Sequence, residues 1–417
     1  MSSISNLKER IDNQIELLLK AVAEEACLQN YKIEKAPGAV KGDGYLGYIT
    51  AICISGKTDS GKEKTLHLVV KSASKSDAAR VETPLAELFD REIYMYNTVI
   101  PTFQKFEKQR NVCPFSSSAK CYQACMLEKS EALILQNLKE DGYSVWERRL
   151  PMEHDHVSLV MREYGRFHAI SFAMKDQEQE QFEKLTASMD DVFTMFLEKA
   201  DSIKLYQKQC RKALDSLDLI ADKNAYATFK TFIDEGLHKF MSNLPELVDK
   251  YSVVLHGDCW TNNMMFKYED KNDPTKPTGM CLIDLQLARL GPPVLDLSYF
   301  LYSCGSKEVL NNYQRYLDLY HDSLSVHLRQ LGSNPDKLYP YSVFREQWKR
   351  SSRFGLTLSV ILIHIMLSEQ NEVADITENA ELGKSIVDAF DYDISNSEAY
   401  NDRVKHIILH FVNNGYI

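Results

Sequence analysis

The chain has 417 residues, of which 44% are hydrophobic, and its formal net charge is −10 at pH 7. This apolar fraction supplies a large core, and the length suits two lobes rather than one average domain. The negative charge argues against nucleic acid or an anionic membrane as the main partner. The nine cysteines form no Cys-x-x-Cys pair, which favours reduced thiols and a cytoplasmic protein over a disulfide-stapled one.

The first third of the chain predicts helices combined with a sheet. Apolar residues recur at helical spacing over residues 6–28, and this N-terminus lacks the long apolar run of a signal peptide. A long amphipathic helix is expected over residues 85–108. Strand-like segments lie at residues 48–54, 65–71, 120–126 and 132–135.

A glycine-rich segment precedes the first of these strands. It holds four glycines in eleven residues, at positions 38, 42, 44 and 47. Glycines between strands can expose backbone N–H groups to phosphate, so Gly42 and Gly44 are candidate nucleotide contacts. A plain turn is the alternative. The position just before a strand pair that ends in Lys71 favours phosphate binding.

From residue 139 onward the pattern is helical, apart from one region. Apolar residues recur at helical spacing over residues 155–174, 177–251, 307–331, 341–368 and 400–412. The longest uncharged run, 354–368, is short for a bilayer span, so we expect a buried core helix there and no membrane segment. The sequence therefore predicts the α+β class, with a small lobe over residues 1–138 and a mostly helical large lobe over 139–417.

The exception is the segment 253–302, which carries the candidate chemistry. An apolar start leads to His256-Gly257-Asp258, and Asn263 follows five residues later. Two short strands joined by the polar turn DKNDPTKPTG then bring the chain back to Asp284. This hairpin is expected to bring Asp258, Asn263 and Asp284 near one another.

Such a constellation suits phosphoryl transfer. That reaction needs one carboxylate near the attacking hydroxyl and oxygen ligands for magnesium beside the nucleotide phosphates. Asp258 is the candidate catalytic residue, and Asn263 and Asp284 are the candidate metal ligands. The alternative is an ordinary turn whose acids cap backbone donors. The pattern HGDxxxxN with apolar-Asp-Leu-Gln at hairpin distance favours the chemistry.

The segments HGDCWTNNMMF and LIDLQ resemble the aminoglycoside phosphotransferase and choline kinase superfamily, which is related to the protein kinases. Trp260, Gln286 and the run GPPVLDLSYFL resemble more narrowly the ecdysteroid-kinase-like proteins, also called CHK-kinase-like and typical of insects. The resemblance covers nearly the whole chain. It implies a protein-kinase-like fold that uses ATP and Mg²⁺.

The resemblance also implies roles in the small lobe. Lys71 stands where kinase-like folds contact the α- and β-phosphates. The family motif Phe-x-x-Glu-x-x-x-Tyr matches Phe89, Glu92 and Tyr96, which implies that Glu92 pairs with this lysine. A solvated lysine and a surface glutamate are the alternatives. The hinge that contacts adenine through its backbone is implied at Gln136, Asn137 and Leu138.

Three further residues near the site are not assigned to the chemistry. Asp296, in a predicted helix, is implied to anchor the backbone of the catalytic turn. His168 is expected to pack and to hydrogen-bond. Cys259 would react with thiol reagents unless it is buried.

The glycine-rich segment departs from its relatives, which commonly show Gly-Glu-Asn-Tyr where this chain has Gly-Asp-Gly-Tyr from Gly42 onward. Backbone contacts to phosphate are therefore expected there, rather than a contact from a side-chain hydroxyl.

The implied function is transfer of the γ-phosphoryl group of ATP to an alcohol hydroxyl of a small molecule, either an ecdysteroid or a xenobiotic or glycoside. An aromatic-rich stretch after the hairpin fits a large apolar acceptor, although aromatic residues at helical spacing usually build core. It contains Tyr299, Phe300, Tyr302, Tyr313, Tyr316, Tyr320 and Trp348. Two alternatives stay open: a non-catalytic pseudokinase that binds a ligand or partner, and a choline- or aminoglycoside-type kinase. The sequence leaves the acceptor and the oligomeric state undetermined.

Overall fold

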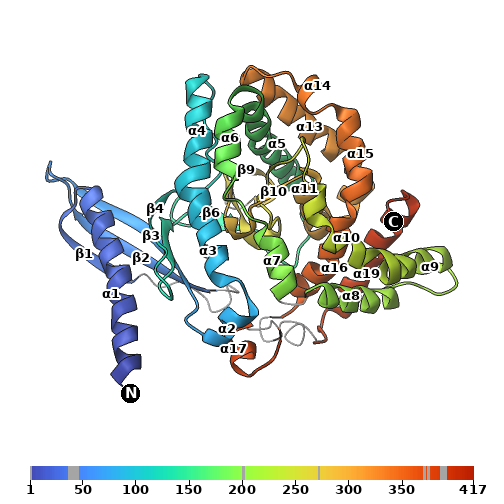
Figure 1. The fold of residues 1–417 in the computed structure, drawn as a ribbon, viewed down its shortest axis with the longest axis horizontal. Helices are drawn as coiled ribbons and strands as arrows, with labels where there is room; N and C mark the ends of the chain where they lie inside the picture. The colour runs from blue at the N-terminus through green and yellow to red at the C-terminus, as the bar shows by residue number, and fades with distance from the viewer. Residues whose placement is uncertain are drawn as a thin grey trace.

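The computed structural model describes residues 2–35, 47–199, 202–270, 273–369, 372, 376–385 and 392–417. Figure 1 shows a smaller lobe that holds a sheet and a larger lobe made mostly of helices. The predicted two-lobed α+β fold is therefore confirmed, while the boundary at residue 138 stays a prediction. Gly42 and Gly44 lie outside the described residues.

The small lobe is built on a five-stranded antiparallel sheet in the order β1-β2-β3-β5-β4. The strands are β1 (Gln29–Lys35), β2 (Gly47–Lys57), β3 (Glu63–Ala73), β4 (Cys121–Cys125) and β5 (Ala132–Gln136). Helix α1 (Ser2–Glu25) packs Leu19 and Val22 against this sheet. Strand β1, an edge strand in which Tyr31 and Ile33 alternate with charged residues, is not among the predicted strands.

The other side of the sheet is covered by α3 (Leu85–Tyr94), which follows the short α2 (Asp77–Glu82). The single helix predicted over 85–108 is wrong in one respect. A π-helical turn, Met95–Val99, separates α3 from α4 (Ile100–Gln109), and the Ile100 N–H donates to Met95 O. Pro101 explains the turn, because it has no N–H to continue the α-helical pattern. Helix α4 nevertheless continues in nearly the direction of α3 (Figure 1).

The large lobe contains two small sheets that frame the predicted hairpin. Strands β8 (Met264–Tyr268) and β9 (Pro277–Leu282) pair as expected, with β6 (Tyr143–Val145) on the outer side of β8. Strand β7 (Val253–Val254) pairs with β10 (Leu290–Gly291). The predicted hairpin is therefore confirmed.

Helices make up the rest of this lobe. The first group is α5 (His154–Gln177), α6 (Gln179–Thr186), α7 (Val192–Lys199), α8 (Ser202–Ala213), α9 (Lys223–Thr231) and α10 (Leu237–Ser242). The second group is α11 (Val294–Cys304), α12 (Lys307–Asn311), α13 (Tyr313–Gln330), α14 (Pro335–Leu338), α15 (Tyr341–Ser351), α16 (Arg353–Leu367), α17 (Ile376–Glu381) and α19 (Ser397–Asn413). Short 3₁₀ or π turns lie at Leu214–Ser216, Phe232–Gly236 and Leu244–Leu247.

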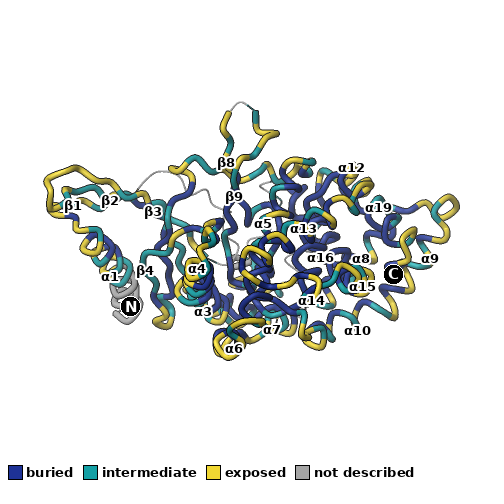
Figure 2. The backbone as a smooth tube through the Cα atoms, turned by 90° about the horizontal axis from the view of Figure 1, so that it is seen from above, coloured by how far each residue is buried: buried dark blue, intermediate teal, exposed yellow. Residues whose placement is uncertain are grey.

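Buried residues concentrate around α5, α13 and α16 (Figure 2). Two glycines let these helices approach their neighbours. A Cβ on Gly165 would lie 2.8 Å from Tyr320 O, and one on Gly355 would lie 2.2 Å from Ser298 O. The buried helix expected over 354–368 is confirmed as α16, but the longer helix predicted over 341–368 breaks at Ser352. The break lets Gly355 seat against α11.

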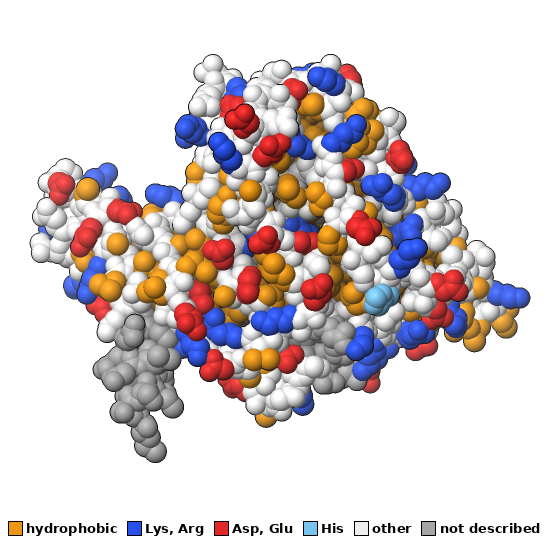
Figure 3. Space-filling model, in the orientation of Figure 1, with side chains coloured by type: hydrophobic (Ala, Val, Ile, Leu, Met, Phe, Trp, Pro, Cys, Tyr) orange, Lys and Arg blue, Asp and Glu red, His pale blue; other side chains and the backbone are white. Residues whose placement is uncertain are grey.

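Within the described part of the chain, no one helix has the length and apolar character needed to cross a membrane. The bent pair Pro335–Ser351 and Arg353–Leu367 meets that requirement jointly, by length and composition. On the face in Figure 3, acidic and basic side chains are interspersed.

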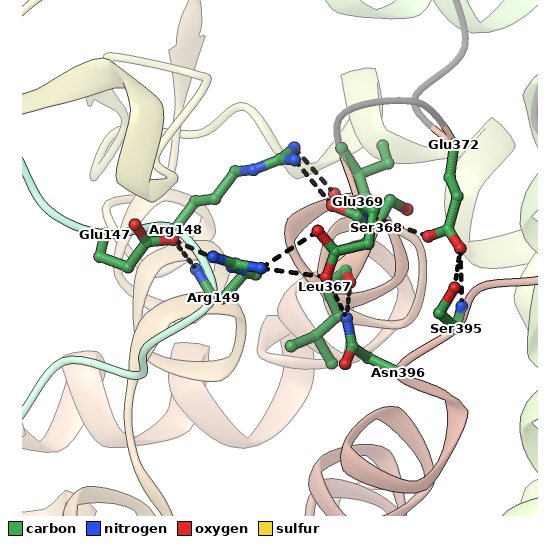
Figure 4. A network of polar contacts seen from close by, with 10 residues as sticks. Glu147, Arg148, Arg149, Leu367, Ser368, Glu369, Glu372, Ser395 and Asn396 are labelled. Atoms are coloured by element: carbon green, nitrogen blue, oxygen red, sulfur yellow. Dashed lines mark hydrogen bonds and ion pairs between the residues drawn. The ribbon is translucent and has the colours of Figure 1, made fainter.

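A polar network fastens the segment after β6 to the end of α16 (Figure 4). The Arg148 guanidinium donates to Ile365 O at 3.2 Å and to Ser368 O at 2.7 Å, and Asn396 Nδ2 donates to Leu367 O at 2.7 Å. The last carbonyls of a helix have no partner within it. These side chains supply those partners and hold the segment after β6 against the end of α16.

Candidate active site

The candidate catalytic turn, His256-Gly257-Asp258, follows β7, and its backbone is held by a buried aspartate from α11. His256 N donates to Asp296 Oδ2 at 2.7 Å, and Gly257 N donates to Asp296 Oδ1 at 3.0 Å. Gly257 has φ 86°, and a Cβ there would lie 2.0 Å from Leu287 O. The turn therefore requires glycine, and the backbone contact expected of Asp296 is confirmed.

A histidine of α5 supports this anchor. His168 Nε2 lies 3.2 Å from Asp296 Oδ2, and its Nδ1 lies 3.0 Å from the Tyr320 hydroxyl. Burial alone would raise the pKa of Asp296, but the hydrogen bond and charge of His168, together with the His256 contacts, lower it below the ordinary value. Asp296 is thus kept ionised as a backbone acceptor, and His168 has the hydrogen-bonding role expected of it.

Both carboxylate oxygens of Asp258 are engaged. Oδ1 accepts a hydrogen bond from the Tyr299 hydroxyl at 2.7 Å, and Oδ2 accepts one from Asn263 Nδ2 at 2.7 Å. Burial and the nearby charge of Asp284 raise the pKa of Asp258 to about 6, although the two hydrogen bonds act in the opposite direction. Asp258 is therefore a carboxylate that can exchange a proton near neutral pH.

The sequence does not predict the hydrogen bond from Tyr299 to Asp258; it places Tyr299 only in the aromatic-rich stretch after the hairpin. Tyr299 lies three residues after Asp296 on α11. Residues at that spacing share one helix face. Since Asp296 was expected to reach the catalytic turn, the same spacing could have pointed to Tyr299.

The hairpin brings Asn263 and Asp284 to the same end of the sheet. Asn263 ends the 3₁₀ turn Thr261–Asn263, and its carbonyl accepts from Ile283 N at 3.0 Å. Asp284 follows in the left-handed conformation, with φ 63° and ψ 62°. Aspartate tolerates that conformation better than most residues. The resulting turn directs the Asp284 carboxylate toward the small lobe.

Lys71, near the end of β3, meets two acids there. Its Nζ lies 2.6 Å from Glu92 Oε2 and 2.6 Å from Asp284 Oδ1. Burial opposes the charge of Lys71, but the two carboxylates outweigh burial and raise the pKa of this amine above its ordinary value. The expected pairing of Lys71 with Glu92 is confirmed, and Lys71 also contacts Asp284.

The predicted hinge begins at Gln136, the last residue of β5. Strand β5 pairs with β3, the strand that carries Lys71. Gln136 pairs with Leu68, three residues before Lys71 on β3, which corresponds to a separation of roughly 10 Å along the strand. Gln136 N donates to Lys120 O at 2.9 Å, and Asn137 N donates to His67 O at 3.0 Å. Two of the three hinge N–H groups are therefore used within the protein.

The aromatic stretch proposed as an acceptor wall lies mainly in the core, so that prediction is wrong for most of its members. Phe300, Tyr302, Tyr320 and Trp348 are at most 1% exposed. They face inward because α11, α13 and α15 direct their apolar sides toward one another. Cys259 is also fully buried, and burial raises the pKa of its thiol well above the usual range. This thiol is therefore protected from reagents.

Comparisons with known proteins give one family match and two more distant similarities. Residues 41–333 match the Ecdysteroid kinase-like family. A 59-residue segment is 30% identical to 4-hydroxytryptamine kinase from Psilocybe cyanescens, and the match spans 14% of this chain and 16% of that relative. The GDP complex of wild-type aminoglycoside 2'-phosphotransferase-IIIa aligns with 96% of this chain and 98% of its own, at 12% identity and a TM-score of 0.41. Because the family match covers more than half of the sequence, including the catalytic turn and its hairpin, the chain belongs to the Ecdysteroid kinase-like family.

Proposed function

We propose that the protein is a small-molecule kinase that transfers the γ-phosphoryl group of ATP to an alcohol hydroxyl. Its family supports the coarser assignment, a small-molecule kinase. The observation that carries the proposal is the junction at Asp284, where the Lys71–Glu92 pair of the small lobe meets the hairpin that also holds Asp258 and Asn263. Phosphoryl transfer depends mainly on such positioning and on charge neutralisation.

The donor set fits a magnesium ion. Asn263 donates its amide N–H to Asp258, which leaves the amide oxygen available as a ligand, and one oxygen of Asp284 is bound by Lys71 while the other remains. Hard cations such as Mg²⁺ take one or two protein oxygens and complete their shell with phosphate and water. Among the described residues no cage of three or more His, Cys, Asp or Glu side chains occurs, which suits this kind of site. When bound, Mg²⁺ would neutralise charge on the β- and γ-phosphates.

Each side chain then has a role. Asp258 orients the acceptor hydroxyl and takes its proton, in place of the Tyr299 hydroxyl that it now binds. Lys71, held by Glu92, contacts the α- and β-phosphates. Leu138 offers the hinge N–H to adenine, since the N–H groups of Gln136 and Asn137 are engaged. Backbone N–H groups near Gly42 and Gly44 cover the phosphates.

For the acceptor we propose a bulky alcohol, either an ecdysteroid or a xenobiotic or glycoside. The support is the family to which the chain belongs. The aromatic side chains of the large lobe no longer contribute to this choice, because they are buried in the core.

A product screen tests both parts of the proposal. Purified protein with ATP and Mg²⁺ is incubated with steroid alcohols, phenolic glycosides and choline, and products are read by mass. We expect a gain of one phosphoryl group on a steroid or glycoside, and no gain with the Asp258→Asn variant. Phosphorylation of choline alone would overturn the acceptor and keep the kinase. The kinase itself would be rejected if no acceptor gained mass and ATP with Mg²⁺ did not bind.

Tyr299→Phe is expected to move the acid limb of kcat/KM for the acceptor to higher pH. Asp258 must be ionised to accept a proton, and its pKa is about 6, so wild-type activity should fall as pH drops through that value. The Tyr299 hydrogen bond favours the charged carboxylate. Its loss should therefore raise the pKa of Asp258.

The control for this pH profile is Tyr316→Phe, because the Tyr316 hydroxyl contacts His154 rather than the base. The acid limb should stay in place in this variant. If the acid limb also stays in place in Tyr299→Phe, that result contradicts the role given to the Tyr299 hydroxyl.

A further inference from the structure

Helix α3 carries Glu92, and a segment of the large lobe packs against this helix. This segment, here called the strap, comprises residues 185–199: the end of α6, the following turn and α7. Figure 1 shows α6 and α7 running alongside α4 and α3. The strap is the part of the large lobe that could set the position of Glu92.

Hydrogen bonds join the strap to the segment just before α3 and to the last turn of α3. Beyond the start of the helix, Lys199 Nζ donates to Arg80 O at 2.8 Å and to Thr83 O at 2.9 Å. At its end, the Tyr94 hydroxyl donates to Leu185 O at 2.8 Å. These contacts fix the direction of the helix.

Arg91, in the last turn of α3 and next to Glu92 in the sequence, also contacts the strap. Its Nη2 donates to Ser188 O at 3.2 Å and to Asp190 O at 3.0 Å. The side chain is only 4% exposed, and its Nε and Nη1 are buried without a hydrogen-bond partner among the described residues. A buried guanidinium with two unpaired nitrogens contributes little net stability. The Arg91 contacts therefore bear on the position of α3 more than on the stability of the fold.

The far side of the strap reaches the catalytic turn. Asp191 Oδ1 lies 3.6 Å from Arg289 Nε, and a Cβ on Gly257 would lie 3.2 Å from Arg289 Nη1. The Arg289 guanidinium also stacks on the Phe193 ring of α7 at 4.3 Å. One short segment thus contacts both the helix of Glu92 and the residue packed against the turn of Asp258.

We infer that the strap holds α3 in the orientation that pairs Glu92 with Lys71, and that Arg91 is a positioning residue for the phosphate site. This inference rests on the proposed function only where it concerns ATP. Arg91 acts through Glu92 and touches neither nucleotide nor acceptor. Loss of the Arg91 contacts should let α3 tilt and should weaken the contact of Lys71 with the phosphates.

The first test measures α3 itself. Arg91→Met keeps the length of the side chain and removes its donors, while Arg110→Met removes bonds to Gln177 and Glu178 that also join this helical run to the large lobe, away from Glu92. Hydrogen exchange of the backbone amides of α3 should become about tenfold faster in Arg91→Met and stay unchanged in Arg110→Met. Arg91→Lys, which still offers donors to both carbonyls, should restore slow exchange. Equal exchange in both Met variants would overturn the inference.

The second test measures ATP use. Arg91→Met should raise KM for ATP about tenfold, with KM for the acceptor and the melting temperature near wild type. In a Glu92→Gln background, Arg91→Met should not raise KM for ATP further, because the Glu92–Lys71 ion pair through which Arg91 acts is already lost. Additive effects of the two changes would overturn the inference.

The two tests also separate this inference from the proposed function. Fast α3 exchange in a protein that never binds ATP would reject the kinase and support the strap. If Arg91→Met does not fold, Tyr94→Phe carries the exchange test, since it removes only the hydroxyl that binds Leu185 O. Unchanged α3 exchange in Tyr94→Phe would then overturn the inference.

Discussion

Asp258→Asn is expected to lower kcat by about 10²–10⁴-fold, the usual cost of losing a general base. The carboxylate lies at the centre of the site, where Tyr299 and Asn263 hold its two oxygens in place. An amide keeps that shape but cannot take the proton of the acceptor hydroxyl. Since the phosphates are assigned to Lys71 and to the metal ligands, ATP affinity should remain close to wild type. Steady-state kinetics and ATP titration check the two halves of this expectation.

Stability separates loss of chemistry from loss of fold. The pKa of Asp258 rises from 3.8 to about 6 on folding, so between these values the folded state binds more protons than the unfolded state. Stability from this group therefore falls as pH rises through that window, and at neutral pH its charge disfavours folding. Asn carries no charge, so the melting temperature of Asp258→Asn at neutral pH should be at or above that of wild type.

The matched control for the activity loss is Asp273→Asn, which changes an aspartate in the turn between β8 and β9. It should leave kcat unchanged. Near wild-type turnover in Asp258→Asn would remove Asp258 from the role of base.

The hairpin was predictable because its information is local. Apolar runs, a polar turn and three polar residues at fixed spacing all lie between residues 253 and 284, and strand pairing follows from such patterns. The contact between Lys71 and Asp284 spans 213 residues. No spacing rule reaches that far, so the expectation for Lys71 and Glu92 depended on resemblance to a family.

Other features had no local signal at all. The strap contacts α3 mainly through backbone carbonyls, such as those of Ser188 and Asp190, and any sequence can supply a carbonyl. The aromatic residues after the hairpin misled for a related reason. Helical spacing shows that they share a face, but whether that face meets core or ligand depends on the neighbouring helices. Tyr299 contacts Asp258, whereas Tyr302, three residues later, contacts His410 within the core.

Asp284→Asn is expected to weaken ATP binding in the presence of Mg²⁺ and to lower turnover, each by at least roughly 100-fold. The change removes the charge of one proposed metal ligand and one of the two carboxylates that Lys71 meets. Lys71 keeps Glu92 at 2.6 Å, so the small lobe should stay intact. The loss that depends on Mg²⁺ therefore reports on the metal ligand, while the Lys71–Glu92 pair remains.

Thermal stabilisation by ATP reads this out without any acceptor. A ligand that binds only the folded state raises the melting temperature. In wild type, ATP should do so with Mg²⁺ and much less with a chelator. Asp258→Asn should keep the Mg²⁺-dependent rise, whereas Asp284→Asn should lose it, because of these two aspartates only Asp284 is assigned to the metal. A full rise in Asp284→Asn would take Asp284 out of the metal site. Failure of wild type to respond to ATP with Mg²⁺ would instead favour a pseudokinase, whose filled catalytic positions would then serve the junction of the two lobes rather than phosphoryl transfer.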